Sequence, residues 1–294
     1  MKKILITGAD SYVGVSFEKW IQQTQEFGKY QIDTLDIKNS TWEDFDFFPY
    51  DVVFHVAGIA HVDIHKVSEK GKQLYYQVNR DLAIAVAEKY KEDRKTKSSQ
   101  FIYMSSLIVY GKEKTIHKNT KPVPSNFYGD SKLQAEIGLQ ALDGNNFHVA
   151  IIRPPIIYGP GSKGNYPLLA KIAQKTPIFP DIKNKRSMLF IDNLAEYVRQ
   201  LIDSQRGGVF FPQNKEYVRT SCMVKEIAKA HGKKIYLFSW ANGLIKLLGY
   251  FPGSIGKMGN KAFGDLVCDK ELNCEFTVPI DFVQSIQETE LFLG

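Results

Sequence analysis

The sequence lacks the features that mark membrane-spanning, disulfide-bonded or metal-binding chains. No apolar run reaches the roughly 18 residues that a membrane-spanning helix needs. The three cysteines, Cys222, Cys268 and Cys274, are odd in number and lack metal-ligand spacing. We therefore expect free thiols in a reducing cytoplasm. Residues 3–7 are apolar but run straight into glycine, which predicts a buried strand rather than a signal peptide.

Composition and charge are those of an ordinary globular protein. The chain has 294 residues, 44% hydrophobic and 24% charged, enough for one large domain or two unequal ones. The net charge of +6 comes from scattered basic residues and suits a phosphate-bearing small molecule. No array of alternating aromatic and basic residues is present, so we expect no nucleic-acid partner.

Two further stretches invite functional interpretations that the sequence does not favour. His55, His61 and His65 could suggest a metal, but no acidic or cysteine partner completes a site, so we predict none. Residues 240–250 are apolar but too short to span a bilayer. We expect a helix that covers a smaller domain there and no membrane partner, with a partner-binding or membrane-surface role as the alternative.

The first residues have the pattern of a dinucleotide-binding unit. A β-prone run is followed by Gly8, Ser11 and Gly14 and then by an amphipathic segment to about residue 23. Glycines let the backbone approach a pyrophosphate, and a helix N-terminus favours anions. Asp36 ends the next predicted strand, where a carboxylate can accept from a ribose hydroxyl and repel a 2′-phosphate. This favours NAD over NADP, although a simple strand-end turn residue is the alternative.

Tyr128 and Lys132 are four residues apart and would share one face of a helix. An ammonium beside a phenol favours the phenolate, so we expect Lys132 to lower the pKa of Tyr128. A phenol tuned in this way can exchange a proton near neutral pH. With 15 Tyr and 38 Lys+Arg, chance alone gives roughly two Tyr-x-x-x-basic pairs, so the spacing needs support from other motifs. Ser105 and Ser106 supply some, because they follow a predicted strand at residues 101–104.

With these motifs in place, the chain resembles an extended short-chain dehydrogenase/reductase of the nucleotide-sugar epimerase/dehydratase family, from residue 3 to about 235. The family's glycine turn matches residues 7–14, with Ser11 in place of a glycine. Its His-x-Ala-(Ala/Gly), Ser-Ser-x-x-Val-Tyr-Gly and Tyr-Gly-x-Ser-Lys-x-x-x-Glu motifs match residues 55–58, 105–111 and 128–136. The later arginine motif matches Arg186, Asp192 and Ala195.

The resemblance implies an α/β fold: a Rossmann-like, doubly wound parallel sheet with a smaller C-terminal α/β substrate domain. Residues 1–153 and about 187–212 would bind NAD, and about 154–186 and 213–294 would bind a nucleotide sugar. The implied catalytic residues are Ser106, Tyr128 and Lys132, and the implied substrate contacts are Ser106, Tyr128, Asn165 and Arg186. The implied NAD contacts are Gly8, Ser11, Tyr12, Val13, Gly14, Asp36, Ile37, Ala57, Gly58, Asn79, Tyr128, Lys132 and Pro155.

The resemblance also implies the reaction, with alternatives left open. Ile156 stands where many 4-epimerases and 4,6-dehydratases have asparagine, and the dehydratase acid pair is absent after Ser106. We favour an NAD-dependent 4-epimerase of a UDP-hexose or UDP-N-acetylhexosamine in surface polysaccharide synthesis. The alternatives are a 4-ketoreductase of a UDP-4-keto-6-deoxy-hexosamine and a non-catalytic cofactor-sensing protein. Relatives often form homodimers, here through segments 75–90 and 131–141.

Overall fold

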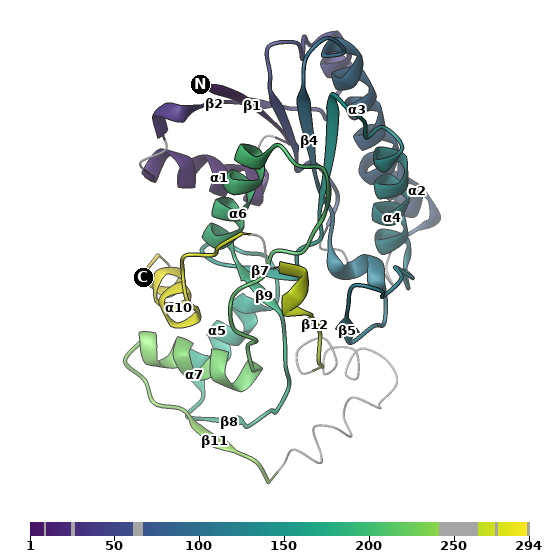
Figure 1. Cartoon of the computed structure of the whole chain (residues 1–294). Helices are drawn as coiled ribbons and strands as arrows, with labels where there is room; N and C mark the ends of the chain where they lie inside the picture. Colours follow the sequence, from purple (N-terminus) through teal and green to yellow (C-terminus); the bar gives the residue numbers. More distant parts are fainter. Residues whose placement is uncertain (9, 25–26, 61–66, 241–263, 274–275, 293–294) are drawn as a thin grey trace.

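The computed structural model describes residues 1–8, 10–24, 27–60, 67–240, 264–273 and 276–292 (Figure 1). At its centre is a six-stranded sheet in which every neighbouring pair of strands is parallel, in the order β10-β6-β4-β3-β1-β2. The strands are β1 (Lys2–Thr7), β2 (Tyr30–Leu35), β3 (Val52–His55), β4 (Ser99–Met104), β6 (Phe147–Ile152) and β10 (Gly208–Phe210). The expected parallel α/β sheet is confirmed.

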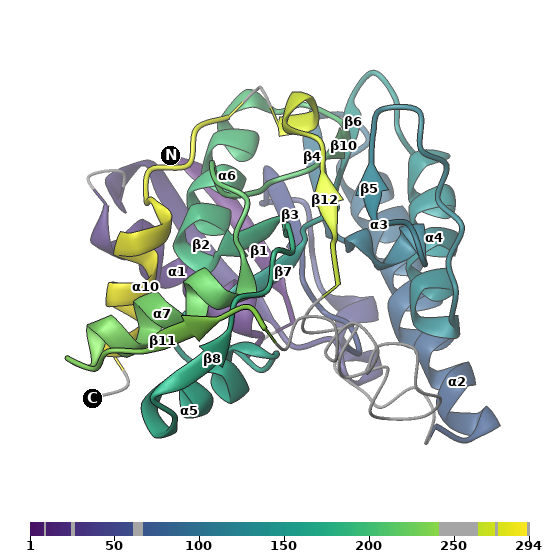
Figure 2. The same ribbon diagram turned by 90° about the horizontal axis from the view of Figure 1, so that it is seen from below.

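Helices cover both faces of this sheet (Figures 1 and 2). On one face lie α1 (Tyr12–Gln23) and α6 (Ile191–Ser204). On the other lie α2 (Glu69–Tyr76), the π-helical turn η3 (Gln77–Asp81), α3 (Leu82–Asp93) and α4 (Phe127–Gln140). Strand β1 shows why two cores form, because successive side chains of a strand point to opposite faces. Ile4 and Ile6 pack in the core on the α1 side, and Leu5 packs in the core on the α3 side.

The strand order reverses beside β1, which pairs with β2 on one side and β3 on the other. In open α/β sheets, ligands bind outside the carboxyl ends of the strands at such a reversal. Thr7 and His55 are register partners at the carboxyl ends of β1 and β3. The fold therefore places the glycine turn after β1 and residues 56–58 after β3 at the edge of the sheet where ligands of such folds bind.

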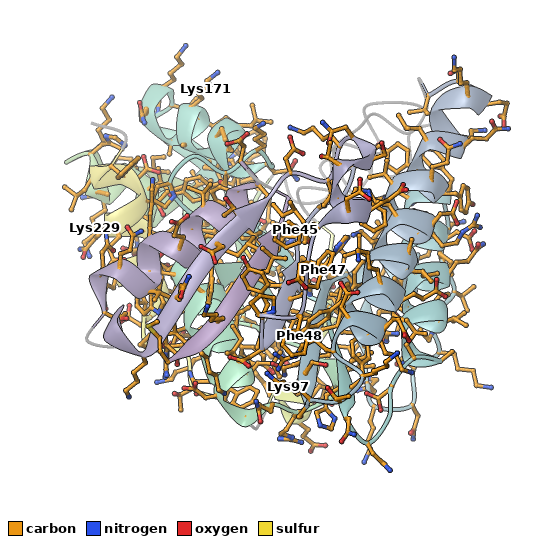
Figure 3. All side chains as sticks on the ribbon, turned by 90° about the horizontal axis from the view of Figure 1, so that it is seen from above. Phe45, Phe47, Phe48, Lys97, Lys171 and Lys229 are labelled. Atoms are coloured by element: carbon orange, nitrogen blue, oxygen red, sulfur yellow. The ribbon has the colours of Figure 1, made fainter. Side chains whose placement is uncertain are left out.

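The segment that joins β2 to β3 along the chain is rich in aromatic residues and packs on one face of the sheet. It contains the 3₁₀ turn η2 (Ser40–Asp44) followed by Phe45, Phe47 and Phe48 (Figure 3). Phe47 is fully buried against Tyr90 of α3, with ring centroids 6.0 Å apart. The ammonium of Lys97 lies 4.2 Å from the centroid of the Phe48 ring.

The remaining elements form a smaller lobe below the sheet in Figure 1. Three parallel two-stranded ribbons contribute to it, β7–β9, β8–β11 and β5–β12. Their strands are β5 (Thr115–Ile116), β7 (Ile156–Tyr158), β8 (Ile178–Pro180), β9 (Met188–Phe190), β11 (Tyr236–Phe238) and β12 (Val267–Cys268). Its helices are α5 (Tyr166–Lys175), α7 (Thr220–Ala230) and α10 (Phe282–Leu291). Short 3₁₀ turns lie at Phe27–Lys29, before β2, at Leu107–Tyr110, after β4, and at Lys270–Asn273, after β12.

Two predictions from the sequence concern residues that lie outside the described part of the chain. The helix expected over residues 240–250 falls, apart from Trp240, outside the described residues, as do His61 and His65. Among the described residues no helix is long and apolar enough to cross a bilayer.

Candidate functional site

The glycine turn after β1 is packed so closely that it has no room for side chains. A backbone without side chains is what a dinucleotide needs to approach closely. Gly8 has φ +106°, and a Cβ added there would lie 2.8 Å from the backbone nitrogen of Ala57. A Cβ on Gly14 would lie 2.7 Å from Ser11 Oγ and 2.9 Å from Ile6 Cγ2. This turn can therefore pack closely against the segment after β3 only because Gly8 and Gly14 have no Cβ.

Ser11, which departs from the glycine pattern, fits the turn without strain. Its φ of −69° and ψ of 138° are ordinary extended values, so no glycine conformation is needed. Ser11 is the N-cap of α1, and its Oγ accepts from the Gly14 amide at 3.0 Å. The first-turn amides of Tyr12 and Val13 remain, as at any helix N-terminus, without intrahelical partners. No acidic residue stands in that turn, so the terminus suits a phosphate.

The other predicted cofactor residues lie in segments that follow the strands at the same edge of the sheet. Asp36 follows β2 and is exposed, and Leu35, which precedes it, accepts through its carbonyl from the Gly8 amide at 3.1 Å. Ile37 is buried beneath it. Pro155 is buried between β6 and β7. The Tyr12 hydroxyl lies 3.0 Å from the position of a Cβ added at Gly159.

Asn79 lies in the π-helical turn, fully buried, and its amide holds the chain that follows β3. Its Oδ1 accepts from the Ile59 amide at 2.8 Å, and its Nδ2 donates to the Ile59 carbonyl at 3.2 Å. Its Nδ2 also donates to Ser131 Oγ of α4 at 3.3 Å. A Cβ on Gly58 would lie 2.9 Å from Asn79 Oδ1. Asn79 thus positions residues 58–59 against α4 through its side chain.

Lys132 is buried at the centre of these elements. Its Nζ donates to the carbonyl of Met104, the last residue of β4, at 2.9 Å. The same ammonium lies 4.6 Å from the centroid of the Tyr103 ring and 3.2 Å from the Cβ position of Gly58. Burial lowers the pKa of Lys132 to about 8, with Glu136 acting in the opposite direction. Lys132 therefore joins α4 to the ends of β3 and β4.

The pKa of Tyr128 does not follow the sequence expectation. Burial raises it to about 12, and proximity to Tyr75 adds to the increase. The two rings lie edge to face with centroids 5.9 Å apart. The expected lowering by Lys132 is wrong for the protein alone, because desolvation of the phenol is the main influence on its pKa and the ammonium is engaged by the Met104 carbonyl. Tyr128 is held as a neutral phenol.

Ser106 lies at the carboxyl end of β4 and begins the turn Leu107–Tyr110. Its Oγ accepts from the Ile108 amide at 3.2 Å. The start of α4 packs on this turn, since a Cβ on Gly129 would lie 2.8 Å from the Ile108 carbonyl oxygen. The chain thus brings the stretches that carry Ser106, Tyr128 and Lys132 to one end of β4.

A buried ion pair supports this end of the sheet, and the sequence patterns did not predict it. Glu136, fully buried one turn beyond Lys132, accepts from Arg153 Nε at 3.1 Å and also from Arg153 Nη2. Ser105 Oγ donates to Glu136, and Arg153 Nη1 donates to the Tyr110 hydroxyl at 2.7 Å. Glu136 ends the motif that begins at Tyr128, but nothing in the sequence pairs it with Arg153.

His55 is a neutral, buried side chain. Its Nδ1 hydrogen-bonds Thr7 Oγ1 at 2.9 Å, and its ring lies beside those of Phe101 and Tyr103. Burial, with a smaller contribution from Lys132, lowers its pKa to about 3. Among the described residues, no cluster of three or more His, Cys, Asp or Glu could hold a metal ion.

The two residues expected to contact the substrate diphosphate line one small pocket of about 20 Å³ in the lobe. Asn165 precedes α5, and Arg186 precedes β9; both line it. Ile156 lines the same pocket, so the position that departs from the 4-epimerase pattern faces the same space. Arg186 is buried and donates through Nη1 to the Gly264 carbonyl at 3.0 Å. Thr220 and Met223 of α7 also line the pocket and were not predicted.

A larger hollow of about 440 Å³ lies elsewhere, near the amino ends of β4 and β6. Its lining includes Lys91, Lys95 and Asn146, and none of the predicted site residues. Because ligands of parallel sheets bind at the carboxyl ends of the strands, we place the candidate site at the crevice around Gly8, Lys132 and Tyr128.

Comparisons with known proteins agree with this arrangement. A model of the NAD dependent epimerase/dehydratase family matches residues 4–211. A UDP-glucose 4-epimerase of Vibrio cholerae is 30% identical over 275 residues, which cover 86% of this chain and 83% of that protein. An N-acetyl-alpha-D-glucosaminyl-diphospho-ditrans,octacis-undecaprenol 4-epimerase of Escherichia coli O157:H7 is 26% identical over 282 residues, 88% of this chain and 82% of that protein.

Solved structures share the fold at lower identity. A UDP-glucuronic acid 4-epimerase from Bacillus cereus in complex with NAD has a TM-score of 0.72 at 18% identity, covering 99% of this chain and 96% of that one. A dTDP-4-dehydrorhamnose reductase from Clostridium acetobutylicum has a TM-score of 0.72 at 18% identity, covering 99% of both chains. Both epimerases and reductases therefore use this fold.

Proposed function

Because this chain belongs to the NAD-dependent epimerase/dehydratase family, we propose that it is a 4-epimerase of a UDP-hexose or UDP-N-acetylhexosamine. The observation that carries the proposal is the position of Lys132. Its ammonium, on the helix that bears Tyr128, meets the end of β4 and residue 58 beside the glycine turn. A general acid–base pair beside a dinucleotide crevice is what hydride transfer at a carbinol carbon requires.

The side chains divide the proton chemistry. Bound NAD supplies the hydride acceptor and a positively charged ring. Tyr128, ionised once the positive nicotinamide ring lies beside it, would take the proton of the C4 hydroxyl, and Ser106 would hydrogen-bond the same oxygen. Lys132 stabilises the phenolate and holds the nicotinamide ribose. With the 4-keto sugar turned over, Tyr128 would return the proton to the C4 oxygen.

We assign the diphosphate to the lobe. Residues 154–186 and 213–294 would bind the nucleotide sugar, and residues 1–153 with 187–212 would bind NAD. Arg186 and Asn165 would contact the diphosphate oxygens, because a guanidinium matches phosphate geometry and both residues line one pocket. The relative from Escherichia coli acts on a sugar diphosphate carried by undecaprenol, so a lipid-linked sugar diphosphate is a second substrate class for the same pocket.

A second candidate function is a 4-ketoreductase of a UDP-4-keto-6-deoxy-hexosamine. Ile156 favours it, because an apolar side chain lines the pocket where many 4-epimerases have asparagine. An epimerase restores its cofactor in each cycle and would carry bound NAD through purification. A reductase would instead consume NADH or NADPH in proportion to product. A non-catalytic cofactor sensor would turn over no nucleotide sugar.

We also propose an oligomeric state and a cellular location for this protein. A homodimer would form through α2–α3 and α4, where Ile137 exposes a large apolar side chain. We also infer that the enzyme works in the cytoplasm, since Cys222 and Cys268 are free thiols.

The test is to incubate the purified protein with UDP-glucose and UDP-N-acetylglucosamine and to identify the products by NMR. We expect interconversion with the galacto epimer of at least one. Tyr128→Phe should lose about 10²- to 10⁴-fold in kcat, whereas Tyr75→Phe, which alters the neighbouring ring, should retain activity. Turnover unaffected by Tyr128→Phe would reject the mechanism, and failure with both sugars would reject the epimerase.

A further inference from the structure

The β8–β11 ribbon lies at the edge of the lobe, far from the six-stranded sheet (Figure 1), and one of its faces exposes apolar side chains. The strands are in register, with Ile178 opposite Tyr236 and Pro180 opposite Phe238. Side chains alternate between the two faces of a ribbon. Phe179 points inward and is buried, whereas Ile178 and Tyr236 are 55% and 60% exposed.

Trp240 extends this face beyond the end of β11. It is 82% exposed, and its ring stacks on Phe238 with centroids 5.3 Å apart. Isoleucine, proline and three aromatic rings therefore lie side by side toward solvent. Single exposed apolar residues are common, but a contiguous set of this kind marks an interaction surface.

Lys234 lies beside the apolar face, and further lysines are exposed on the same lobe. Lys234 Nζ lies 5.1 Å from the centroid of the Tyr236 ring, and Lys175 ends α5 just before β8. Lys171 and Lys229 project from α5 and α7 of the same lobe (Figure 3). Residues 163–180 and 220–240 together contain seven lysines, all exposed, and one acidic residue, Glu226. These two segments thus carry a formal charge of +6, as large as that of the whole chain.

We propose that the β8–β11 face docks on an anionic phospholipid surface, with Tyr236, Phe238 and Trp240 at the level of the headgroups. Aromatic rings favour the membrane–water interface, and lysines next to them are attracted by anionic headgroups. A protein partner of opposite charge would need acidic groups that face water, whereas a membrane supplies negative charge and an apolar layer together. This revises the expectation of no membrane partner without requiring a spanning helix.

The position of the face has a consequence for the candidate substrate pocket. The helices α5 and α7, which flank the ribbon, also contribute Tyr166, Leu169, Thr220 and Met223 to the pocket with Arg186. A lobe docked through β8–β11 would hold that pocket close to the lipid surface. The docking itself does not depend on the proposed function, and it would serve a sugar diphosphate carried on a lipid.

The experiment is co-sedimentation of the full chain with vesicles of phosphatidylcholine alone or mixed with phosphatidylglycerol. We expect binding only to the mixed vesicles, weakened by salt, with a blue shift of the Trp240 emission. Tyr236→Ala with Trp240→Ala should lower the partition coefficient about tenfold, and Lys175→Gln with Lys234→Gln about 25-fold, or fivefold for each lysine.

Matched controls are Leu291→Ala, which removes an apolar side chain 81% exposed on α10, and Lys118→Gln with Lys121→Gln. Both should bind vesicles as the wild type does. No sedimentation with mixed vesicles, or equal sedimentation of all variants, would overturn the proposal. The proposal would also be overturned if the Tyr236/Trp240 variant bound vesicles as the wild type does but no longer self-associated. That result would assign the face to contact with a second copy of the chain. Epimerase activity on a soluble UDP-sugar, measured alongside, separates failure of docking from failure of the proposed reaction.

Discussion

The ammonium of Lys132 and the carbonyl of Met104 are joined by a hydrogen bond of 2.9 Å. This contact fixes α4 to the carboxyl end of β4, two residues before Ser106. It also places a buried cation close to Gly58, at the crevice beside β1 and β3. The positions of the proton-transfer groups thus depend on one lysine, whose charge is disfavoured by burial and compensated by a backbone dipole.

The ionisation of Tyr128 should depend on the cofactor. In protein freed of nucleotide, burial raises the pKa of Tyr128 to about 12, so the phenol should stay neutral wherever the protein is folded. Binding of NAD brings a positive ring, and a cation nearby lowers a phenol pKa by about 1–3 units. Near-ultraviolet difference titration of wild type against Tyr128→Phe, with and without NAD, measures both values. A Tyr128 phenolate near neutral pH without nucleotide would show that Lys132 outweighs burial.

His55 should make the protein sensitive to acid. Its pKa is about 3 in the folded protein and about 6.5 in the unfolded chain, so the unfolded state binds more protons between these values. The free energy of unfolding should therefore fall as the pH drops from 6.5 toward 3, by about 2 kcal/mol for this group between pH 7 and pH 5. In urea unfolding, the free energy of unfolding of His55→Asn should fall by about 2 kcal/mol less between pH 7 and pH 5 than that of the wild type. His117→Asn, at an exposed position, is the control, and an unchanged slope in His55→Asn would contradict the assignment.

The ion pair of Glu136 and Arg153 should be costly to break from one side. Glu136→Gln leaves a buried guanidinium without a counter-charge, so we expect a loss of about 3–5 kcal/mol in the free energy of unfolding. Replacing both partners by apolar residues, Glu136→Leu with Arg153→Met, should cost less. Glu92→Gln, which breaks an exposed pair with Lys95, should change stability by less than about 0.5 kcal/mol. Equal losses in the two glutamate variants, measured by urea unfolding, would mean that burial does not matter here.

Arg186 should affect substrate binding more than the chemical step. Arg186→Ala removes a charged donor from the pocket, and such a hydrogen bond contributes about 1.5–3 kcal/mol, or about 10- to 100-fold in KM for the UDP-sugar. Affinity for NAD, followed by calorimetry, should not change. Arg219→Ala, which breaks a pair with Asp181 outside the pocket, should leave KM unaltered. A fall in kcat at constant KM would place Arg186 in the chemical step instead.

The parallel sheet, the glycine turn and the helix that bears Tyr128 and Lys132 could be predicted because each depends on residues close together in the chain. Strand β1 followed by Gly8 and Gly14 is a local pattern of backbone freedom and apolar spacing. Ser11 could be judged only from its dihedral angles, which make it an ordinary N-cap. The distribution of apolar residues also indicated strands buried on both faces, as Leu5 and Ile6 are.

What the tertiary structure decided is the environment of each side chain. The sequence placed Lys132 one turn from Tyr128, but burial, which no spacing records, sets the direction of the phenol's pKa. The contacts of Glu136 with Arg153, and the shared pocket of Asn165 and Arg186, join residues from separate elements. Such contacts form only when helices and strands pack, because the free energies of burial and of charge pairing depend on surroundings that residues distant in the chain supply.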